Sequence, residues 1–532
     1  MLPPPKSNST PLSPAQTLVD GRAVQKYSFA RRYLLLLIFC LAQFMDAVNN
    51  SALFSAIPSL IIAFNITESQ STWIISAFQL TFASFLLISG KISDIYNPKY
   101  AFICGFLVLG IFSLGAGFVK DKISLIVLRA LSGVAASMTI PSALTLLVNV
   151  FPEPQEQARA IGIFGGCGAI GNISGLIIGA IFVQFADWRW VFWFVALVAI
   201  PVAGFCVVFI PPYESRDTAA STGYAKWRSL DLGGVSILTA ALILFIYAIT
   251  SGSTSGWGSA GVLAPLIISV AMVVGFFYYE TRIPASIAAV PPATWFLPNF
   301  AVLFGVALIP YLWWTTVFTI YTTLWQNYYH WSVISSALRM LPIGAFAFAM
   351  SFTGSLSRFT SPKYILLPAQ GVVLIATILL HFADAPDKYY AFVIPAFILG
   401  TTGCMLTYTH ANIAIFRTVP SSMAGTVGAI FNGALQLGSA VGLAAVSSIE
   451  SSVEKTHGGP TQYAGRAAAF WFVFGIVCVE IIAVAIFYRV SSEKKAEAEQ
   501  QDQGIAEEKL QPLSETPSIM TPMEEKKEID MA

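Results

Sequence analysis

The sequence predicts an all-α membrane protein with fourteen transmembrane helices, and three observations lead to that fold class. Hydrophobic residues make up 56% of the 532 residues and charged residues only 11%, with a mean hydropathy of +0.71. A soluble domain carries about 25% charged residues. The apolar residues are gathered into runs that reach the ~20 residues needed to cross a bilayer as helix. The number of such runs is even, which places both termini on one side of the membrane.

Short polar connections separate the fourteen predicted spans. In chain order the spans are 34–63, 72–89, 100–119, 123–148, 159–183, 189–210, 231–250, 261–279, 299–323, 332–353, 364–382, 389–410, 421–448 and 467–489. The first run is too long for a removable signal peptide, so we interpret it as a permanent helix. Lys and Arg are more frequent in the loops on the side of the amino terminus, which favours cytosolic termini.

The composition excludes several classes of protein. The formal net charge of +1 argues against a nucleic-acid partner. All six cysteines fall inside apolar runs without CxxC spacing, so neither a disulfide framework nor a zinc site is indicated. The sequence has no GxxxxGK[ST] loop for a nucleotide, and its four histidines lack metal-ligand spacing within a helix. We therefore expect no cofactor, no metal and no enzyme activity.

Two internal echoes predict a repeated architecture. Residues 90–100 and 354–364 share Gly, Ser, Pro, Lys and Tyr at an offset of 264. Four glycines of span five recur in span thirteen at an offset of 263: Gly162, Gly165, Gly175 and Gly179 match Gly425, Gly428, Gly438 and Gly442. Span two therefore corresponds to span ten, and span five to span thirteen. This correspondence predicts two parallel six-helix halves related about the membrane normal.

The predicted organisation follows from that repeat. In chain order we expect a cytosolic head at 1–32, a first half at 33–210, a linker with two extra helices at 211–298, a second half at 299–489 and a cytosolic tail at 490–532. The head and the tail are polar, and the tail is rich in Lys, Glu, Gln and Pro. Such segments bury too little apolar surface to fold, so we expect both to be disordered.

Two ionisable residues inside spans are the candidates for coupling transport to protons or substrate. Asp46 lies in span one, where an ionised carboxylate is costly unless it faces a cavity or a partner. Arg129 lies in span four and stays charged, so its role would be electrostatic, acting on Asp46 if the two face each other. The alternatives are an acid merely tolerated near water and an arginine that snorkels to one surface.

A tight loop after span two is a candidate cytosolic gate. It contains Gly90, Asp94 and Lys99, which a glycine-led turn can bring between two helix ends. The alternative is a solvated charged turn. Asn65 begins an Asn-x-Thr sequon in the first outward loop. That loop is short, which favours an unmodified sequon over a glycosylated one.

Small and polar residues inside spans form two further candidate groups. Span five carries glycines that line one helix face and let another backbone approach: Gly162, Gly171, Gly175 and Gly179. Three amides are candidates for a cargo cavity: Gln79 in span two, and Asn432 and Gln436 in span thirteen. Each amide can equally form an interhelical hydrogen bond. Glu480 in span fourteen can serve as a proton site or as a packing contact.

Together these motifs resemble the major facilitator superfamily. The loop at Gly90 is similar to its loop-2/3 signature, and Arg129 with Gly133 to the fourth-helix signature of its proton-coupled members. Span five resembles the antiporter signature, with Leu176 and Ala180 in place of its proline and last glycine. The resemblance covers residues 33–489 and is strongest to the fungal fourteen-spanner drug:proton antiporter-2 family, near the aminotriazole-resistance and low-affinity ammonium transporters.

The resemblance implies a proton-driven efflux pump of the plasma membrane that works by alternating access. Its expected partners are protons, the lipid bilayer and a small amphipathic metabolite or toxicant, and we expect a monomer. A second interpretation keeps the fold and reverses its use, as uptake or facilitation of a small polar solute such as ammonium or borate. A third is a nutrient sensor, which would require a longer signalling tail. Neither cargo identity nor transport direction follows from the sequence.

Overall fold

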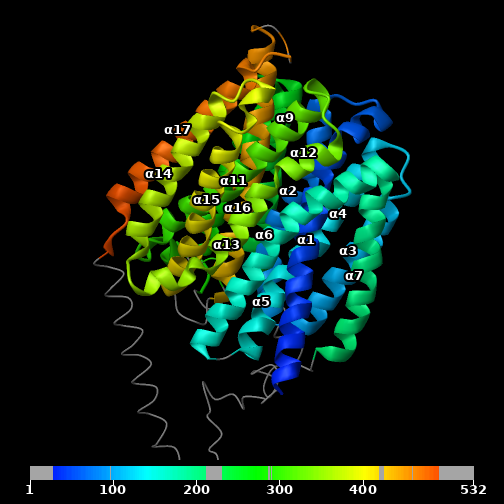
Figure 1. Cartoon of the computed structure of the whole chain (residues 1–532). Coiled ribbons are helices and arrows are strands. Elements are labelled where there is room, and N and C mark those ends of the chain that lie inside the picture. The colour runs from blue at the N-terminus through cyan, green and yellow to red at the C-terminus, as the bar shows by residue number, and fades with distance from the viewer. Residues whose placement is uncertain are drawn as a thin grey trace, which may run out of the picture.

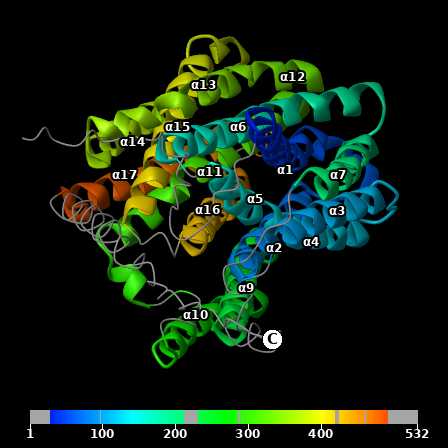
Figure 2. The same cartoon turned by 90° about the horizontal axis from the view of Figure 1, so that it is seen from below.

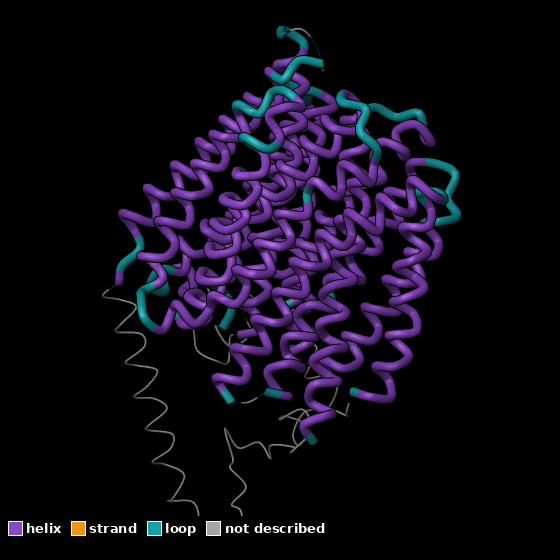
Figure 3. Tube along the Cα trace, viewed as in Figure 1, coloured by secondary structure: helices purple, strands orange, loops and turns teal. Residues whose placement is uncertain are grey.

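The computed structural model describes residues 28–490 apart from 96, 152, 211–230, 285–287, 289, 291, 419–423, 458 and 460. Every regular element in this part of the chain is a helix (Figure 3). Fourteen helical segments are long and apolar enough to cross a membrane, as the sequence predicted. The chain is therefore a multi-pass membrane protein with an all-helical fold.

The helices that precede the linker form a first bundle. In chain order they are α1 (Phe29–Phe64), α2 (Glu68–Ile95), α3 (Pro98–Ala116), α4 (Lys122–Ser137), α5 (Thr139–Val150), α6 (Pro154–Phe185) and α7 (Arg189–Phe209). Helix α1 begins five residues before the predicted span. Its first turn is stabilised there because Arg32 forms an ion pair with Glu156 at the start of α6 and stacks over the Phe151 ring at 4.8 Å.

A second bundle follows the linker. Its helices are α11 (Phe300–Thr323), α12 (Val333–Arg339), α13 (Leu341–Ser351), α14 (Pro362–His381), α15 (Val393–Arg417), α16 (Ala424–Glu454) and α17 (Ala464–Phe487). Four short turns, η1 (Pro292–Phe296), η2 (Leu324–Tyr328), η3 (Phe352–Arg358) and η4 (Pro386–Tyr389), join or extend them. The two linker helices, α9 (Leu232–Ser255) and α10 (Ala260–Glu280), lie to one side of both bundles, with α9 packed on α2 and α16 (Figure 2).

Two of the predicted spans are each divided into two helices. The span predicted at 123–148 breaks at Met138 between α4 and α5, and Pro141 lies in the first turn of α5. The span predicted at 332–353 breaks at Met340, and Pro342 lies in the first turn of α13. Proline lacks a backbone N–H and fits a first helical turn, where that donor has no intrahelical acceptor. The breaks therefore follow from the two prolines.

The bundles meet mainly where α2 packs on α16 and where α6 packs on α12 and α13. Helix α1 begins and α17 ends at the same end of the molecule, which we call the terminal end (Figure 1). We call the opposite end, which holds the turn from α1 to α2, the distal end. The contact between the bundles therefore runs along helices that pass from one end to the other.

Equivalent glycines pack equivalent helices in the two bundles. A β-carbon added at Gly175 or Gly179 of α6 would lie 2.9 Å from the Cα of Val48 or Ala52 of α1. In the second bundle, β-carbons at Gly438 and Gly442 of α16 would lie 2.9 and 3.2 Å from the Cα of Leu308 and Leu312 of α11. We call the two contacts the first seam (α1–α6) and the second seam (α11–α16). Only glycine permits such an approach of two backbones.

The repeated lysines also make matching contacts. Lys99 Nζ donates to the backbone oxygens of Val207 and Ile210 at 2.9 and 2.5 Å, at the end of α7. In the second bundle, Lys363 Nζ donates to Ala485 and Tyr488 oxygens at 2.8 and 2.9 Å, at the end of α17. A cation at a helix carboxyl terminus stabilises carbonyl groups that lack an intrahelical donor.

Some predictions concern residues outside the described part of the chain. Residues 1–27 of the predicted head and 491–532 of the predicted tail lie outside it. Asp94 belongs to α2, but its side chain also lies outside the described residues.

Candidate functional site

Asp46 lies in the middle of α1 and is buried, with 8% of its surface exposed. Its Oδ1 atom has no hydrogen-bond partner. A buried carboxylate without hydrogen bonds is strongly disfavoured, whereas its protonated form is far less so. The site is therefore one at which uptake of a proton would remove a large electrostatic penalty.

Arg129 of α4 lies beside this carboxyl and is 1% exposed. Its Nη1 donates to Asn49 Oδ1 and its Nε to the Ile74 oxygen, both at 3.2 Å. The guanidinium also stacks over the Phe78 ring at 4.4 Å, a favourable cation–π contact. Asp46 and Arg129 interact electrostatically, but no ion pair within 4.0 Å joins them. The arginine is held by α1 and α2 and does not snorkel to a surface.

Asp46 also lies near the second bundle. Tyr311 of α11 is partly buried and lies within electrostatic range of both Asp46 and Tyr408 of α15. A β-carbon at Gly165 of α6 would lie 3.8 Å from the Tyr408 ring. The carboxyl thus belongs to the junction between the bundles, where it would sense their relative movement.

A hydroxyl relay joins the bundles on the α2 side. Gln79 Nε2 donates to Ser439 Oγ of α16 at 2.9 Å, and Ser439 Oγ lies 2.5 Å from Thr315 Oγ1 of α11. Gln436 is buried with no partner for Oε1, one turn from Ser439. Asn432 instead donates to the Gly428 oxygen of its own helix at 2.9 Å. Among the three predicted cargo-cavity amides, Gln79 is the one that reaches across to the other bundle through its amide nitrogen.

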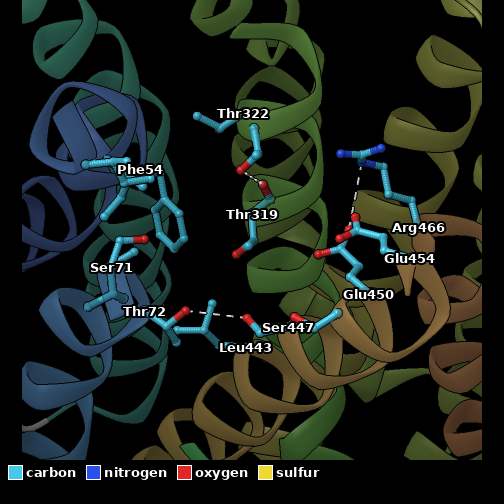
Figure 4. A pocket seen from close by; sticks show the side chains of 15 residues that line it. Phe54, Ser71, Thr72, Thr319, Thr322, Leu443, Ser447, Glu450, Glu454 and Arg466 are labelled. Carbon is cyan, nitrogen blue, oxygen red and sulfur yellow. Dashed lines mark hydrogen bonds and ion pairs between the residues drawn. The ribbon is translucent and has the colours of Figure 1, made fainter. Parts of the chain in front are cut away.

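A cavity opens at the distal end between the two bundles (Figure 4). It encloses about 700 Å³ of empty space, including its open mouth. One wall is apolar and comes from Phe54, Ile57 and Ile61 of α1. The facing wall carries Glu450 and Glu454 of α16, near Arg466 of α17 (Figure 4).

Charged and hydroxyl side chains form much of the lining of this distal cavity. Glu450 Oε1 lies 3.9 Å from Arg466 Nε, and the arginine stacks over the Tyr328 ring at 4.5 Å. Two carboxylates and one guanidinium give the lining a formal charge of −1. Seven hydroxyl side chains also line it: Ser71, Thr72, Thr319, Thr322, Thr323, Ser447 and Ser451. Such a surface is suited to an amphipathic solute that carries an amine.

The distal cavity and Asp46 lie on the same helix at different depths. Phe54, at the cavity wall, follows Asp46 by eight residues. At 1.5 Å per residue, that is about 12 Å along α1. A solute that enters the cavity must therefore travel two helical turns farther to reach the carboxyl.

The predicted glycines of span five have two different settings. Gly171, Gly175 and Gly179 all face α1, and a β-carbon at Gly171 would lie 2.7 Å from the Phe44 oxygen. Gly162 instead faces the second bundle, where the Ser351 oxygen would lie 4.0 Å from its β-carbon. The antiporter-like stretch of α6 therefore packs on α1, the helix that carries Asp46. The part of α6 around Gly162, nearer the terminal end of the molecule, contacts the second bundle.

The predicted gate residues lie at the terminal end of α2 and the start of α3. Gly90 is buried within α2, so the glycine-led loop predicted there is helical. Lys99 binds the end of α7 within its own bundle. This contact fixes the position of the Lys99 ammonium, and the part of Gly90, Asp94 and Lys99 in a cytosolic gate stays a prediction. Asn65 is exposed in the tight turn after α1, with a φ of 50°.

Sequence reasoning missed several residues of this region. Tyr311 was not among the predicted site residues, although its place seven residues before the buried Phe318 could have indicated an inward face. Glu450 and Glu454 lie four apart at the end of α16, a spacing that places both on one face. In the part of the chain that the structure describes, no three His, Cys, Asp or Glu side chains gather as a metal site.

The chain matches the Major Facilitator Superfamily over residues 39–443. It is 26% identical over 467 residues to the major facilitator superfamily multidrug transporter mfsC of Aspergillus fumigatus, which covers 85% of this chain and 86% of that protein. It is 28% identical over 430 residues to the puromycin resistance protein pur8 of Streptomyces alboniger, covering 79% and 82%. It is 25% identical over 459 residues to a low affinity ammonium transporter of Saccharomyces cerevisiae, covering 85% and 87%.

The family match spans most of the chain and coincides with fourteen candidate spans in an all-helical fold. The three relatives named above align over 82–87% of their own lengths and include a multidrug transporter. The family match agrees with the two packed helix bundles of the structure and with the buried charges between them. The chain therefore belongs to the major facilitator superfamily and is a secondary transporter, not an enzyme.

Proposed function

We propose that this transporter exports a small amphipathic metabolite or toxicant in exchange for protons, as a member of the fungal drug:proton antiporter-2 family. The observation that carries the proposal is the Asp46 carboxyl, buried at the junction of the bundles with an oxygen that lacks a hydrogen bond. A group in that position binds a proton when water reaches it from one side. It releases the proton when Arg129 or a cationic cargo replaces the proton as its counter-charge.

The proposed cycle rocks the first half, 33–210, against the second half, 299–489. Both termini are cytosolic and the membrane is the plasma membrane, so that the distal cavity faces outward. In that state an outside proton reaches Asp46 and the cargo leaves past Glu450 and Glu454. Closure of the distal end then exposes Asp46 to the cytosol, where the proton leaves and new cargo binds.

The lining of the distal cavity supports an amine-bearing cargo. The apolar wall of Phe54, Ile57 and Ile61 would contact a hydrophobic body, and the carboxylates would attract a positive group. Puromycin is both amphipathic and basic, and a puromycin resistance protein is among the relatives. It is therefore the first probe to use.

The test uses purified protein in proteoliposomes with an acidic lumen and radiolabelled puromycin outside. We expect uptake by wild-type protein well above that of protein-free liposomes, which report passive trapping of the base. Asp46→Asn removes the proton site and keeps the side-chain volume, so the protein-dependent initial rate should fall at least tenfold. If Asp46→Asn retained the full gradient-driven rate, the assignment of Asp46 would be wrong.

Asp121→Asn is the matched control. Asp121 caps α4 by accepting from the Ser124 backbone N–H at 2.8 Å, and asparagine caps a helix equally well. The capping bonds hold the pKa of the Asp121 carboxyl below its usual range, so it stays ionised at assay pH and exchanges no proton. We expect this variant to transport puromycin like wild type.

Uptake or facilitation of ammonium is a second candidate, favoured by the formal charge of −1 on the distal lining and by the yeast relative. That lining attracts a cation and gives no support to borate. The two candidates differ in their driving force. Facilitation predicts radiolabelled methylammonium flux down its own gradient, unaffected by Asp46→Asn, and no puromycin transport. Export predicts the opposite pattern.

A further inference from the structure

Two cysteines meet across the first seam. Cys40 of α1 is buried, Cys167 of α6 is half-buried, and both pack in the same apolar core, with their side chains within interaction range of each other. The other four cysteines, Cys104, Cys206, Cys404 and Cys478, lie on four different helices. Nothing in the proposed transport cycle uses this pair.

The packing of the seam explains why the thiols come together. A β-carbon at Gly171 would lie 2.7 Å from the Phe44 oxygen and 2.9 Å from the Ala47 β-carbon. Cys40 precedes Phe44 by four residues, and Cys167 precedes Gly171 by four. Residues four apart share one helix face, so the two cysteines occupy the next level of the seam.

The helix directions support the same register. The first seam pairs Phe44 with Gly171, Val48 with Gly175 and Ala52 with Gly179, so α1 and α6 run parallel and advance together. A disulfide needs Cα atoms about 4.4–6.8 Å apart. The glycine contacts at Gly171 and Gly175 hold the two backbones in close approach at the neighbouring levels of the seam, which favours such a separation at Cys40 and Cys167.

We propose that Cys40 and Cys167 form a reversible redox modification site, with a small peroxide as oxidant and a thiol as reductant. The Cys167 sulfur, which is more exposed, attacks hydrogen peroxide. An S–O bond forms, the O–O bond breaks, and water leaves behind a sulfenic acid. The Cys40 sulfur then attacks Cys167, the S–S bond replaces the S–O bond, and a second water carries away the Cys40 proton. An added dithiol returns two electrons and two protons.

The product staples α1 to α6 six residues before Asp46. Because both helices already touch along the seam, the bond requires no change in their packing. The staple lies within the first bundle and does not cross to the second. Oxidation therefore links α1, the helix that carries Asp46, to α6 without joining the two bundles.

The experiment treats purified full-length protein with hydrogen peroxide, blocks remaining thiols with N-ethylmaleimide and digests the protein without reductant for mass spectrometry. We expect one dominant linked peptide pair containing Cys40 and Cys167, two hydrogens lighter than the reduced pair and lost after dithiothreitol. Cys206, Cys404 and Cys478 should stay free to react once the protein is unfolded.

Matched variants separate the proposed pair from unspecific oxidation. Cys40→Ala, which suits an apolar site, and Cys167→Ala should each abolish the linked peptide, whereas Cys206→Ala should leave its yield unchanged. Gel filtration of each variant confirms a folded protein before oxidation. The proposal is overturned if Cys40 and Cys167 of the wild-type protein are both alkylated by N-ethylmaleimide added after peroxide. It is also overturned if the disulfides formed join other cysteines or separate chains.

Discussion

The first and second seams have the same backbone arrangement and different chemistry. Gly175 packs on Val48 of α1, and Gly438 packs on Leu308 of α11, which aligns the two helices at an offset of 260 residues. At that offset Asp46 corresponds to Val306, and Asn49 to Ile309. Both counterparts are fully buried and apolar. The charged centre therefore has no equivalent in the second bundle.

The difference teaches that the repeated scaffold and the coupling chemistry are separable. Glycine spacing and the Lys99 and Lys363 contacts are present in both bundles, because each bundle must pack its helices. A buried ionisable group is destabilising, so it is retained only where it has work to do. The second bundle contributes instead the acidic wall of the distal cavity, at Glu450 and Glu454.

The largest expected effect comes from filling either seam. Gly175→Val and Gly438→Val each place a β-carbon within 2.9 Å of a facing Cα, which neither helix can relieve by moving a side chain. We expect loss of most monodisperse protein in both cases, measured by fluorescence-detected gel filtration. Gly204→Ala and Gly275→Ala, which meet nothing within 4 Å, should be tolerated. A tolerated seam variant would contradict the shared packing.

The next effect tests the asymmetry of charge. Arg129→Met removes the donor to Asn49 and the positive neighbour of Asp46, so we expect puromycin transport to fall at least tenfold while the protein stays folded. Removing one member of a buried charged group commonly costs about 3–5 kcal/mol unless the other neutralises, which Asp46 can do by binding a proton. The control, Arg189→Met, breaks the more exposed contact with Asp187. Equal losses in both variants would remove the special role of Arg129.

The sequence predicted the scaffold better than the contacts of its charged residues. Length and hydropathy were enough to place fourteen spans, because a bilayer demands long apolar helices. The same pattern carries no information on which acceptor a lysine finds, so the contact of Lys99 with the end of α7 could not be predicted. Asn49, which lies one turn from Asp46 and receives the Arg129 hydrogen bond, could be recognised only once α1 and α4 were packed.

The distal cavity was beyond sequence reasoning for a related reason. Its lining combines α1 and α2 from the first bundle with α11 and α16 from the second, and Arg466 comes from α17. Charges at the end of a helix, such as Glu450 and Glu454, are usually solvated. Only the tertiary arrangement brings them opposite the apolar wall at Phe54.

A smaller effect is expected at the acidic wall. Glu454→Gln removes one negative charge at the cavity mouth and preserves the contact between Arg466 and Glu450. An interaction with a solvent-exposed charge is worth about 1 kcal/mol or less, so the KM for puromycin should rise by up to about fivefold. The kcat should not change, and the difference should shrink at high salt because the charge is screened. A fall in kcat with unchanged KM would contradict a role of Glu454 in attracting the cationic cargo.

The smallest effect compares the two lysine contacts. Lys99→Met and Lys363→Met each remove a cation from a helix carboxyl terminus, an interaction worth about 0.3–1 kcal/mol. We expect both to lower the melting temperature by a similar amount, about 1–4 °C, in a thermal-shift assay. Lys388→Met, which breaks a surface ion pair with Asp384, should change it less. A large loss of transport in Lys99→Met alone would contradict equivalent packing roles for the two lysines and would support the predicted gate at Lys99.

The most direct test of Asp46 as the coupling group is a measurement of proton flux. Proteoliposomes contain a pH-sensitive dye in the lumen and start without a pH gradient. The puromycin concentration is higher in the lumen than outside. Wild-type protein should acidify the lumen as protons enter in exchange, and Asp121→Asn should do the same. Asp46→Asn should abolish the signal, even if puromycin still leaves. Puromycin-driven acidification of wild-type size in Asp46→Asn would contradict the account.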